Sequence, residues 1–333
     1  MEATGKTTRI VLFGVCSVCA ALAITFGIYY LREYKGKKKK GSITDVFESL
    51  HKLREDDSGS SFVIKQELAE ILNENGHGEF TKGTMASLLE LLEKVEDHML
   101  EKLLVALLNC SAFTTNQNII RECGGLSRLV TLLTHPKKTI IIKAVQVLSN
   151  LAMNEKNQAC LKDSVFEIIK NLEYCDVLDD DDVITEHLKL MVNLSVTNTA
   201  HEEIMTGAQA FFDILCRSHS EKIQKEVLRL LVNLSCNTNN LEGLLGLKPL
   251  LILQTFMLAD NQDDIVLRAV TIVANLLSSP DGYTEQQQAV ITEHLNVLYG
   301  ELMRLLDHTD ENIQSQAKRA LRSIFAFRMM YTT

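Results

Sequence analysis

Apolar residues recur at the spacing of amphipathic helices in five stretches of the chain beyond residue 100. Each stretch carries an asparagine near its end, followed by a small or apolar residue: LLVALLNCSAF, KAVQVLSNLAM, HLKLMVNLSVT, VLRLLVNLSCN and RAVTIVANLLS. The asparagines are Asn109, Asn150, Asn193, Asn233 and Asn275. They are separated by 41, 43, 40 and 42 residues, a period typical of solenoid repeats built from two or three helices.

The segments between these stretches predict further helices. After the first stretch, NQNIIRECGGLSRLVTLL indicates a short helix, a break at Gly124-Gly125 and a second helix. One such repeat cannot bury its own apolar face, so neighbouring repeats must stack around a shared core and leave a concave surface. The sequence therefore predicts an all-α fold, a right-handed α-solenoid of about five to six repeats over residues 85–333. Its first helix is expected from about Met85 to Val95.

The last repeat is expected to be atypical. Its candidate helix, AKRALRSIF, has the apolar spacing of the others and no asparagine. It follows the segment SSPDGYTEQQQAVITEH, which we interpret as a longer insert.

An uncharged run of 22 residues lies between Arg9 and Arg32. A helix of that length spans roughly 33 Å, enough for the apolar core of a bilayer. The run is longer than the apolar region of a cleaved signal peptide. The sequence therefore predicts a tail at residues 1–9, a transmembrane signal anchor at 10–31, and a basic flank with a polar, partly helical linker at 32–84.

Cations around this span predict its orientation. Two precede it and six follow it, and lysine and arginine stay on the cytoplasmic side, so the bulk of the chain should face the cytosol. The predicted membrane flank comprises Arg9, Arg32, Lys35, Lys37, Lys38, Lys39 and Lys40. A moderately apolar span with a dense basic flank resembles the signal anchors of the mitochondrial outer membrane. The endoplasmic reticulum membrane is the alternative.

Composition narrows the class of function. The net charge of −9 combines +6 in residues 1–40 (8 cations, 2 acids) with −15 in residues 41–333 (26 cations, 41 acids). An acidic body disfavours nucleic acid as a partner, because phosphate binding needs clustered cations. Only 3 prolines and 16 glycines make an all-β fold improbable. No catalytic or nucleotide-binding motif occurs, so we expect no enzyme, no cofactor, no metal and no small-molecule substrate.

The run NQNIIRECGGLSRLVTLL and the helices that end in asparagine resemble the armadillo repeat. Together with the anchor and its basic flank, the chain is similar to the X-linked armadillo family of membrane-anchored proteins, over roughly residues 85–325 plus the anchor. The resemblance implies three-helix repeats, no enzymatic activity and residence in the mitochondrial outer membrane. It also implies roles in mitochondrial distribution and cell growth, with mitochondrial transport adaptors or small GTPases as partners.

The resemblance further implies that the five asparagines line the concave groove. An asparagine amide both donates and accepts, so the row could follow the main chain of an extended partner segment. Alternatively, the amides bond to the adjacent helix and shape the solenoid. The residues one turn earlier are Val105, Gln146, Lys189, Arg229 and Thr271.

Nuclear-import receptors of this fold place tryptophan one turn before the asparagine, and this chain has none. Basic nuclear-localisation peptides are therefore disfavoured. Lys189 and Arg229 are candidates for an acidic partner segment, or form a solvated pair of cations.

Two functions remain open. The first is a membrane-anchored scaffold that recruits cytosolic proteins for mitochondrial distribution and dynamics. The second is a regulator of cell growth or survival that restrains a signalling or transcription factor at a membrane, for which the endoplasmic reticulum membrane is a candidate.

Overall fold

The computed structural model describes residues 80–331, apart from residues 178, 259 and 279–281. The predicted tail, the predicted span, its basic flank and the linker up to residue 79 lie outside the described residues. Within the described part, no helix combines the length and hydropathy needed to cross a bilayer. The segment Glu79–Thr333 forms one compact unit, and only this unit is described below.

The described residues fold into helices and their connecting turns, without strands. The helices that carry the asparagine row, which we call third helices, are α5 (Asp97–Cys110), α8 (Lys138–Leu151), α11 (Asp181–Leu194), α14 (Glu221–Ser235) and α17 (Asp263–Leu276). A sixth, α19 (Glu311–Tyr331), occupies the same place in the last repeat. The predicted all-helical solenoid is therefore confirmed for this part of the chain.

Two shorter helices complete each repeat. The first helices are α6 (Thr114–Glu122), α9 (Glu155–Leu161), α12 (His201–Met205) and α15 (Leu241–Gly246). The second helices are α4 (Lys82–Leu91), α7 (Gly125–Thr131), α10 (Val165–Glu173), α13 (Ala208–Arg217) and α16 (Pro249–Phe256). Single 3-10 turns adjoin them at η2 (Leu132–Thr134), η3 (Lys162–Ser164), η4 (Asn198–Ala200) and η5 (Thr238–Asn240).

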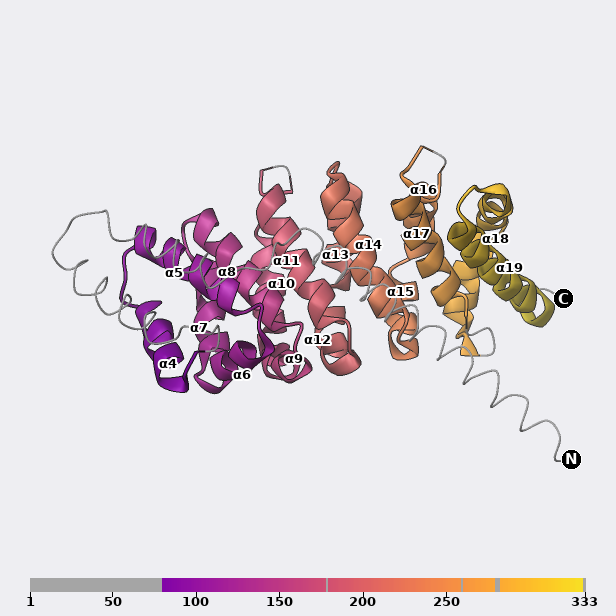
Figure 1. Ribbon diagram of the computed structural model, residues 1–333. Helices are drawn as coiled ribbons and strands as arrows, with labels where there is room; N and C mark the ends of the chain where they lie inside the picture. The colour runs from indigo at the N-terminus through magenta and orange to yellow at the C-terminus, as the bar shows by residue number, and fades with distance from the viewer. Residues whose placement is uncertain (1–79, 178, 259, 279–281, 332–333) are drawn as a thin grey trace, which may run out of the picture. The chain divides into compact units, whose positions relative to one another are not determined.

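The third helices form one continuous layer. Each packs against the third helix before it and the one after it in chain order (Figure 1). Helix α8 shows why: Ile140, Ala144, Leu148 and Leu151 recur every three or four residues and are fully buried, so one stripe of the helix meets its neighbours. Equivalent positions of successive third helices therefore lie in rows that run from repeat to repeat.

A tight turn joins the first and second helices of a repeat. Gly124 takes the left-handed conformation (φ 72°) between α6 and α7. A Cβ on the next residue, Gly125, would lie 2.6 Å from Ile120 Cγ2 and 2.9 Å from Leu89 Cδ1. The predicted Gly-Gly break is thus a turn in which one glycine supplies the backbone angle and the other allows close packing.

Both ends of the solenoid differ from the sequence expectation. Helix α4 begins at Lys82 instead of about Met85, because the Thr81 hydroxyl accepts a hydrogen bond from the Thr84 amide and caps the helix. At the other end, most of the expected insert belongs to the 20-residue helix α18 (Glu285–Arg304), which the 3-10 turn η7 (Leu305–Asp307) follows. A capping box between Thr284 and Gln287 starts α18.

Candidate functional site

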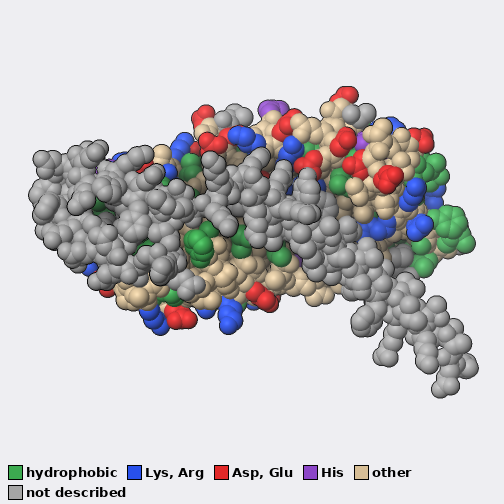
Figure 2. Space-filling model, in the orientation of Figure 1, with side chains coloured by type: hydrophobic (Ala, Val, Ile, Leu, Met, Phe, Trp, Pro, Cys, Tyr) green, Lys and Arg blue, Asp and Glu red, His purple; other side chains and the backbone are tan. Residues whose placement is uncertain are grey.

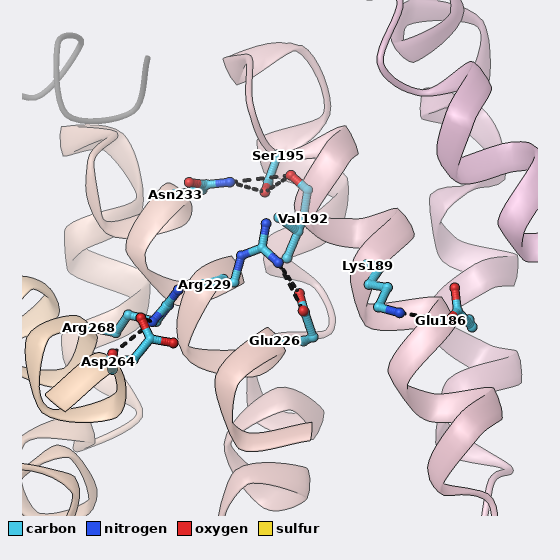
Figure 3. A network of polar contacts seen from close by, with 9 residues as sticks. All are labelled: Glu186, Lys189, Val192, Ser195, Glu226, Arg229, Asn233, Asp264 and Arg268. Atoms are coloured by element: carbon cyan, nitrogen blue, oxygen red, sulfur yellow. Dashed lines mark hydrogen bonds and ion pairs between the residues drawn. The ribbon is translucent and has the colours of Figure 1, made fainter. Parts of the chain in front are cut away.

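The five predicted asparagines lie next to the C-terminal ends of their third helices. The amide nitrogen of Asn150 donates to Leu108 O (3.1 Å) and Ser111 Oγ (3.0 Å), which belong to the end of the preceding third helix. Asn233 donates in the same way to Val192 O (3.3 Å) and Ser195 Oγ (3.0 Å) (Figure 3). The asparagine row therefore ties each repeat to the one before it.

A serine two residues after the asparagine provides the acceptor for the next repeat. Ser111, Ser195 and Ser235 each donate to the backbone carbonyl three residues earlier and accept from the asparagine of the following repeat. Where Ala152 replaces this serine, Asn193 donates to the carbonyl of Ser149 instead (2.8 Å). The three N-x-S sequences of the chain are therefore part of the contact between repeats.

These bonds determine which hydrogen-bond donors and acceptors of the asparagine side chains remain available to a partner. Asn150 and Asn233 use both amide hydrogens within the solenoid, which leaves the side-chain oxygen as the remaining acceptor. Asn150, Asn193 and Asn275 are buried, whereas Asn233 is half-buried. The oxygen of Asn275 accepts from Arg319 (2.6 Å). Asn109 is half-buried and has no third helix before it in the described range. Its side chain makes no hydrogen bond to the described residues.

The row one turn before the asparagines is half-buried over Val105, Gln146, Lys189 and Arg229, and Thr271 is buried. Lys189 Nζ contacts Glu186 Oε1 at 2.7 Å, and Arg229 Nη1 contacts both carboxylate oxygens of Glu226 at 2.8 and 2.9 Å (Figure 3). Each cation is thus paired with a glutamate three residues earlier on its own helix. These two cations are accordingly not a solvated pair.

Helix α17 reverses this order of charge. Arg268 stands seven residues before Asn275, where Glu186 and Glu226 stand relative to their asparagines. Its guanidinium is buried, pairs with the Asp264 carboxylate one turn earlier and donates to the Asp264 carbonyl (2.8 Å). The charged strip of Glu186, Lys189, Glu226, Arg229, Asp264 and Arg268 therefore crosses three consecutive third helices with no net charge (Figure 3).

A second polar row was missed by the sequence analysis. At the start of each first helix, a buried side chain bonds to the carbonyl six residues earlier, at the end of the preceding third helix. The pairs are Asn116 with Cys110 (3.2 Å), Asn157 with Leu151 (3.0 Å), His201 with Ser195 (2.9 Å), and Asn240 with Leu234 (2.9 Å). These bonds satisfy helix-terminal carbonyls. The recurrence of asparagine or histidine seven or eight residues after the asparagine row was the available signal.

His201 is the titratable member of this row. Its Nε2 donates to the Ser195 carbonyl, and its Nδ1 faces the amide nitrogens of Asn240 (2.9 Å) and Asn237 (3.2 Å). Since those nitrogens can only donate, Nδ1 must accept and the ring is neutral. Burial lowers the pKa of His201, in agreement with this arrangement.

Metal-ligating groups and thiols among the described residues bear on catalysis and metal binding. No group of three or more His, Cys, Asp or Glu side chains among them is placed to hold a metal ion. Burial raises the pKa of the Cys110 thiol to about 12 and that of Cys175 to about 11, so neither is a thiolate nucleophile at neutral pH.

The family model described as Armadillo-like matches residues 81–307. The chain belongs to the Armadillo-like family. This Armadillo-like chain is 21% identical to an engineered protein from a structural genomics consortium, with a TM-score of 0.64 over 73% of this chain and 97% of that one. It is 20% identical to a designed armadillo repeat protein in complex with the peptide (KR)4, with a TM-score of 0.63 over 72% and 99% of the two chains.

These comparisons show the fold and the family. Armadillo repeats typically serve as non-catalytic binding scaffolds.

Proposed function

We propose that this Armadillo-like protein is a membrane-anchored scaffold that holds extended segments of cytosolic proteins against its third-helix layer. The observation that carries the proposal is the repetition of one polar arrangement on consecutive third helices, with the asparagine row beside the charged strip. A main chain lying along the row would meet an acceptor oxygen from Asn150, Asn193 and Asn233 in turn.

For location we propose the mitochondrial outer membrane, with the solenoid in the cytosol. Support comes from the uncharged run at residues 10–31, its basic flank and the resemblance to the X-linked armadillo family. The same resemblance supports mitochondrial transport adaptors or small GTPases as partners and mitochondrial distribution as the process. The endoplasmic reticulum membrane is the competing location.

The charged strip supports a partner segment of mixed charge. The designed armadillo protein named above is in complex with a wholly basic peptide. In this chain, Lys189 and Arg229 already neutralise Glu186 and Glu226, so a basic peptide would have to displace them. Replacing both cations by glutamine should strengthen binding of (KR)4 about tenfold or more, measured by fluorescence anisotropy. Equal affinities would show that the strip does not contact the peptide.

Proximity labelling with the full chain tests the binding face. Lys189→Ala plus Arg229→Ala should remove a defined set of neighbours, because the variant changes the charged strip. The matched control is Lys170→Ala plus Arg217→Ala, which removes two exposed cations from the second helices of the same two repeats. Loss of the same neighbours in both variants, or in neither, would reject the third-helix layer as the functional face.

Location requires a separate test. Deleting residues 1–40 should release the protein from mitochondria without changing which segments bind the solenoid. A fully active soluble fragment would reject the anchored scaffold and favour the regulatory alternative. A glycosidase-induced loss of mass at the N-x-S sites would place the solenoid in a lumen and contradict the proposed orientation.

A further inference from the structure

The last third helix, α19, exposes a stripe that combines cations with large apolar side chains. Lys318, Arg322, Phe325 and Met329 are all exposed and follow one another at intervals of three or four residues. At that spacing they share one face of the helix. Phe325 is 68% exposed and Met329 is 67% exposed, so the stripe is not covered by the rest of the described solenoid.

Helix α18 extends this surface. The guanidinium of Arg328 on α19 lies 5.1 Å from the ring centroid of Tyr299 on α18 and donates to Asn296 Oδ1 (3.0 Å). Tyr299 itself is 40% exposed. We call the surface made by Tyr299, Lys318, Arg322, Phe325, Arg328 and Met329 the C-terminal patch. Figure 2 shows hydrophobic and basic side chains gathered together at the end of the solenoid that α18 and α19 form.

The charge of α19 is opposite to that of the protein. The helix holds four cations and one acid, Glu311, which lies at the end far from Phe325, whereas residues 41–333 carry −15. Lys318 contacts the Gln314 amide oxygen at 3.5 Å and no carboxylate in the described range. Large apolar side chains that are exposed among cations mark an interaction site, so this face calls for an occupant.

We propose that the C-terminal patch binds an anionic lipid surface. Charge complementarity favours this occupant, because phosphate headgroups suit Lys318, Arg322 and Arg328 while Phe325 and Met329 enter the boundary between headgroups and acyl chains. A tyrosine with an apolar ring and a polar tip is also typical of that boundary. The inference depends on the proposed membrane anchoring in one respect, namely that the anchor brings the solenoid close to lipid. The patch itself is made of residues that the structure describes.

The chain contains no tryptophan, so a tryptophan introduced into the patch is the only source of tryptophan fluorescence. Full-length protein with Phe325→Trp carries a single tryptophan and is reconstituted into vesicles of phosphatidylcholine alone or with added phosphatidylserine. Emission should shift to the blue, and brominated lipid should quench it, only when phosphatidylserine is present. Tyr174→Trp, at an exposed position just after α10, should report water in both kinds of vesicle.

Charge reversal completes the test. In the Phe325→Trp background, Lys318→Glu plus Arg322→Glu should raise the phosphatidylserine content needed for half-maximal shift about tenfold or abolish the shift. The control Lys170→Glu plus Arg217→Glu makes the same change of charge on second helices. It should leave the phosphatidylserine content needed for half-maximal shift unaltered. An equal shift in both kinds of vesicle, or none in either, would overturn the proposal.

Two further outcomes are distinguishable. A blue shift in detergent that grows with protein concentration would assign the patch to a second copy of the chain and overturn the lipid proposal. Flotation of the vesicles of phosphatidylcholine alone, which the patch should not bind, tests the anchor independently. If the chain does not float, the proposed anchoring fails, and vesicles mixed with the chain in solution still report whether Phe325→Trp meets lipid.

Discussion

At three junctions between repeats, a serine that stands two residues after one asparagine of the row bonds to the asparagine of the next repeat. The serine hydroxyl turns back to its own helix and offers its oxygen to an asparagine 38 to 40 residues later. The sequence shows both residues at the right period, yet it does not show that they bond to each other. That partnership depends on the stacking distance between helices, which periodicity alone does not define.

A double-mutant cycle measures this contact. Removing both Ser195 and Asn233 by alanine substitution should cost about 1 kcal/mol less free energy of unfolding than the sum of the single changes, because one hydrogen bond links them. The measurement is urea unfolding followed by circular dichroism. Ser195→Ala with Asn150→Ala, which do not bond to each other, should be additive. Additivity in the first pair would contradict the described contact.

His201 should make stability depend on pH. Its pKa is lowered in the folded state, mainly by burial, and an unfolded histidine titrates near pH 6.5. Between these two pKa values the unfolded chain binds more protons, so the free energy of unfolding falls as the pH drops below about 6.5.

The variant His201→Asn should lose less stability between about pH 7.5 and about pH 5.5 than the parent chain. Asparagine keeps a donor for the Ser195 carbonyl, as Asn157 and Asn240 do in their repeats. The pKa of the buried His187 is also lowered, so part of the pH dependence should persist. Identical pH profiles in urea titrations would refute a role for His201.

At the scale of elements, the third helices were predictable because they are long and strongly periodic. Of the first helices, the sequence predicted only the short helix before Gly124-Gly125. Helices α9 and α12 are only seven and five residues long, too short for a periodic pattern to reveal them. Helix α18 was mistaken for an insert because its first turn, Glu285–Gln288, is polar. The capping box at Thr284 was the signal that should have indicated a helix start.

One element boundary stores backbone strain. Lys248, directly before α16, has φ 52°, and it is the only described residue other than glycine with a positive φ. In the repeat of α6 and α7, Gly124 occupies the corresponding turn. Lys248→Gly should therefore increase the free energy of unfolding by about 1 kcal/mol. Lys248→Ala removes the charge and keeps the strain, so it should give no such gain in urea unfolding.

At the scale of the whole solenoid, the fold follows from repetition. Each third helix packs on the neighbouring third helices, so the layer continues from repeat to repeat. It does not depend on the side chains outside these contacts. The sequence predicted an asparagine near the end of each of five helices, and the asparagines lie there. The pairing of Lys189 and Arg229 with glutamates on the same helices was not foreseen. We expect such half-buried side chains to determine which partner binds. The repeat period does not predict which residues they are or how they pair.

Photo-crosslinking from the third-helix layer tests the central claim most directly. A benzophenone amino acid replaces Gln146, which is half-buried one turn before Asn150, in the full chain in cells. Phe166, 67% exposed on second helix α10, is the control position. We predict that position 146 captures partner proteins through short contiguous segments and that position 166 does not. Capture of the same proteins from both positions, or from position 166 alone, would contradict binding at the third-helix layer.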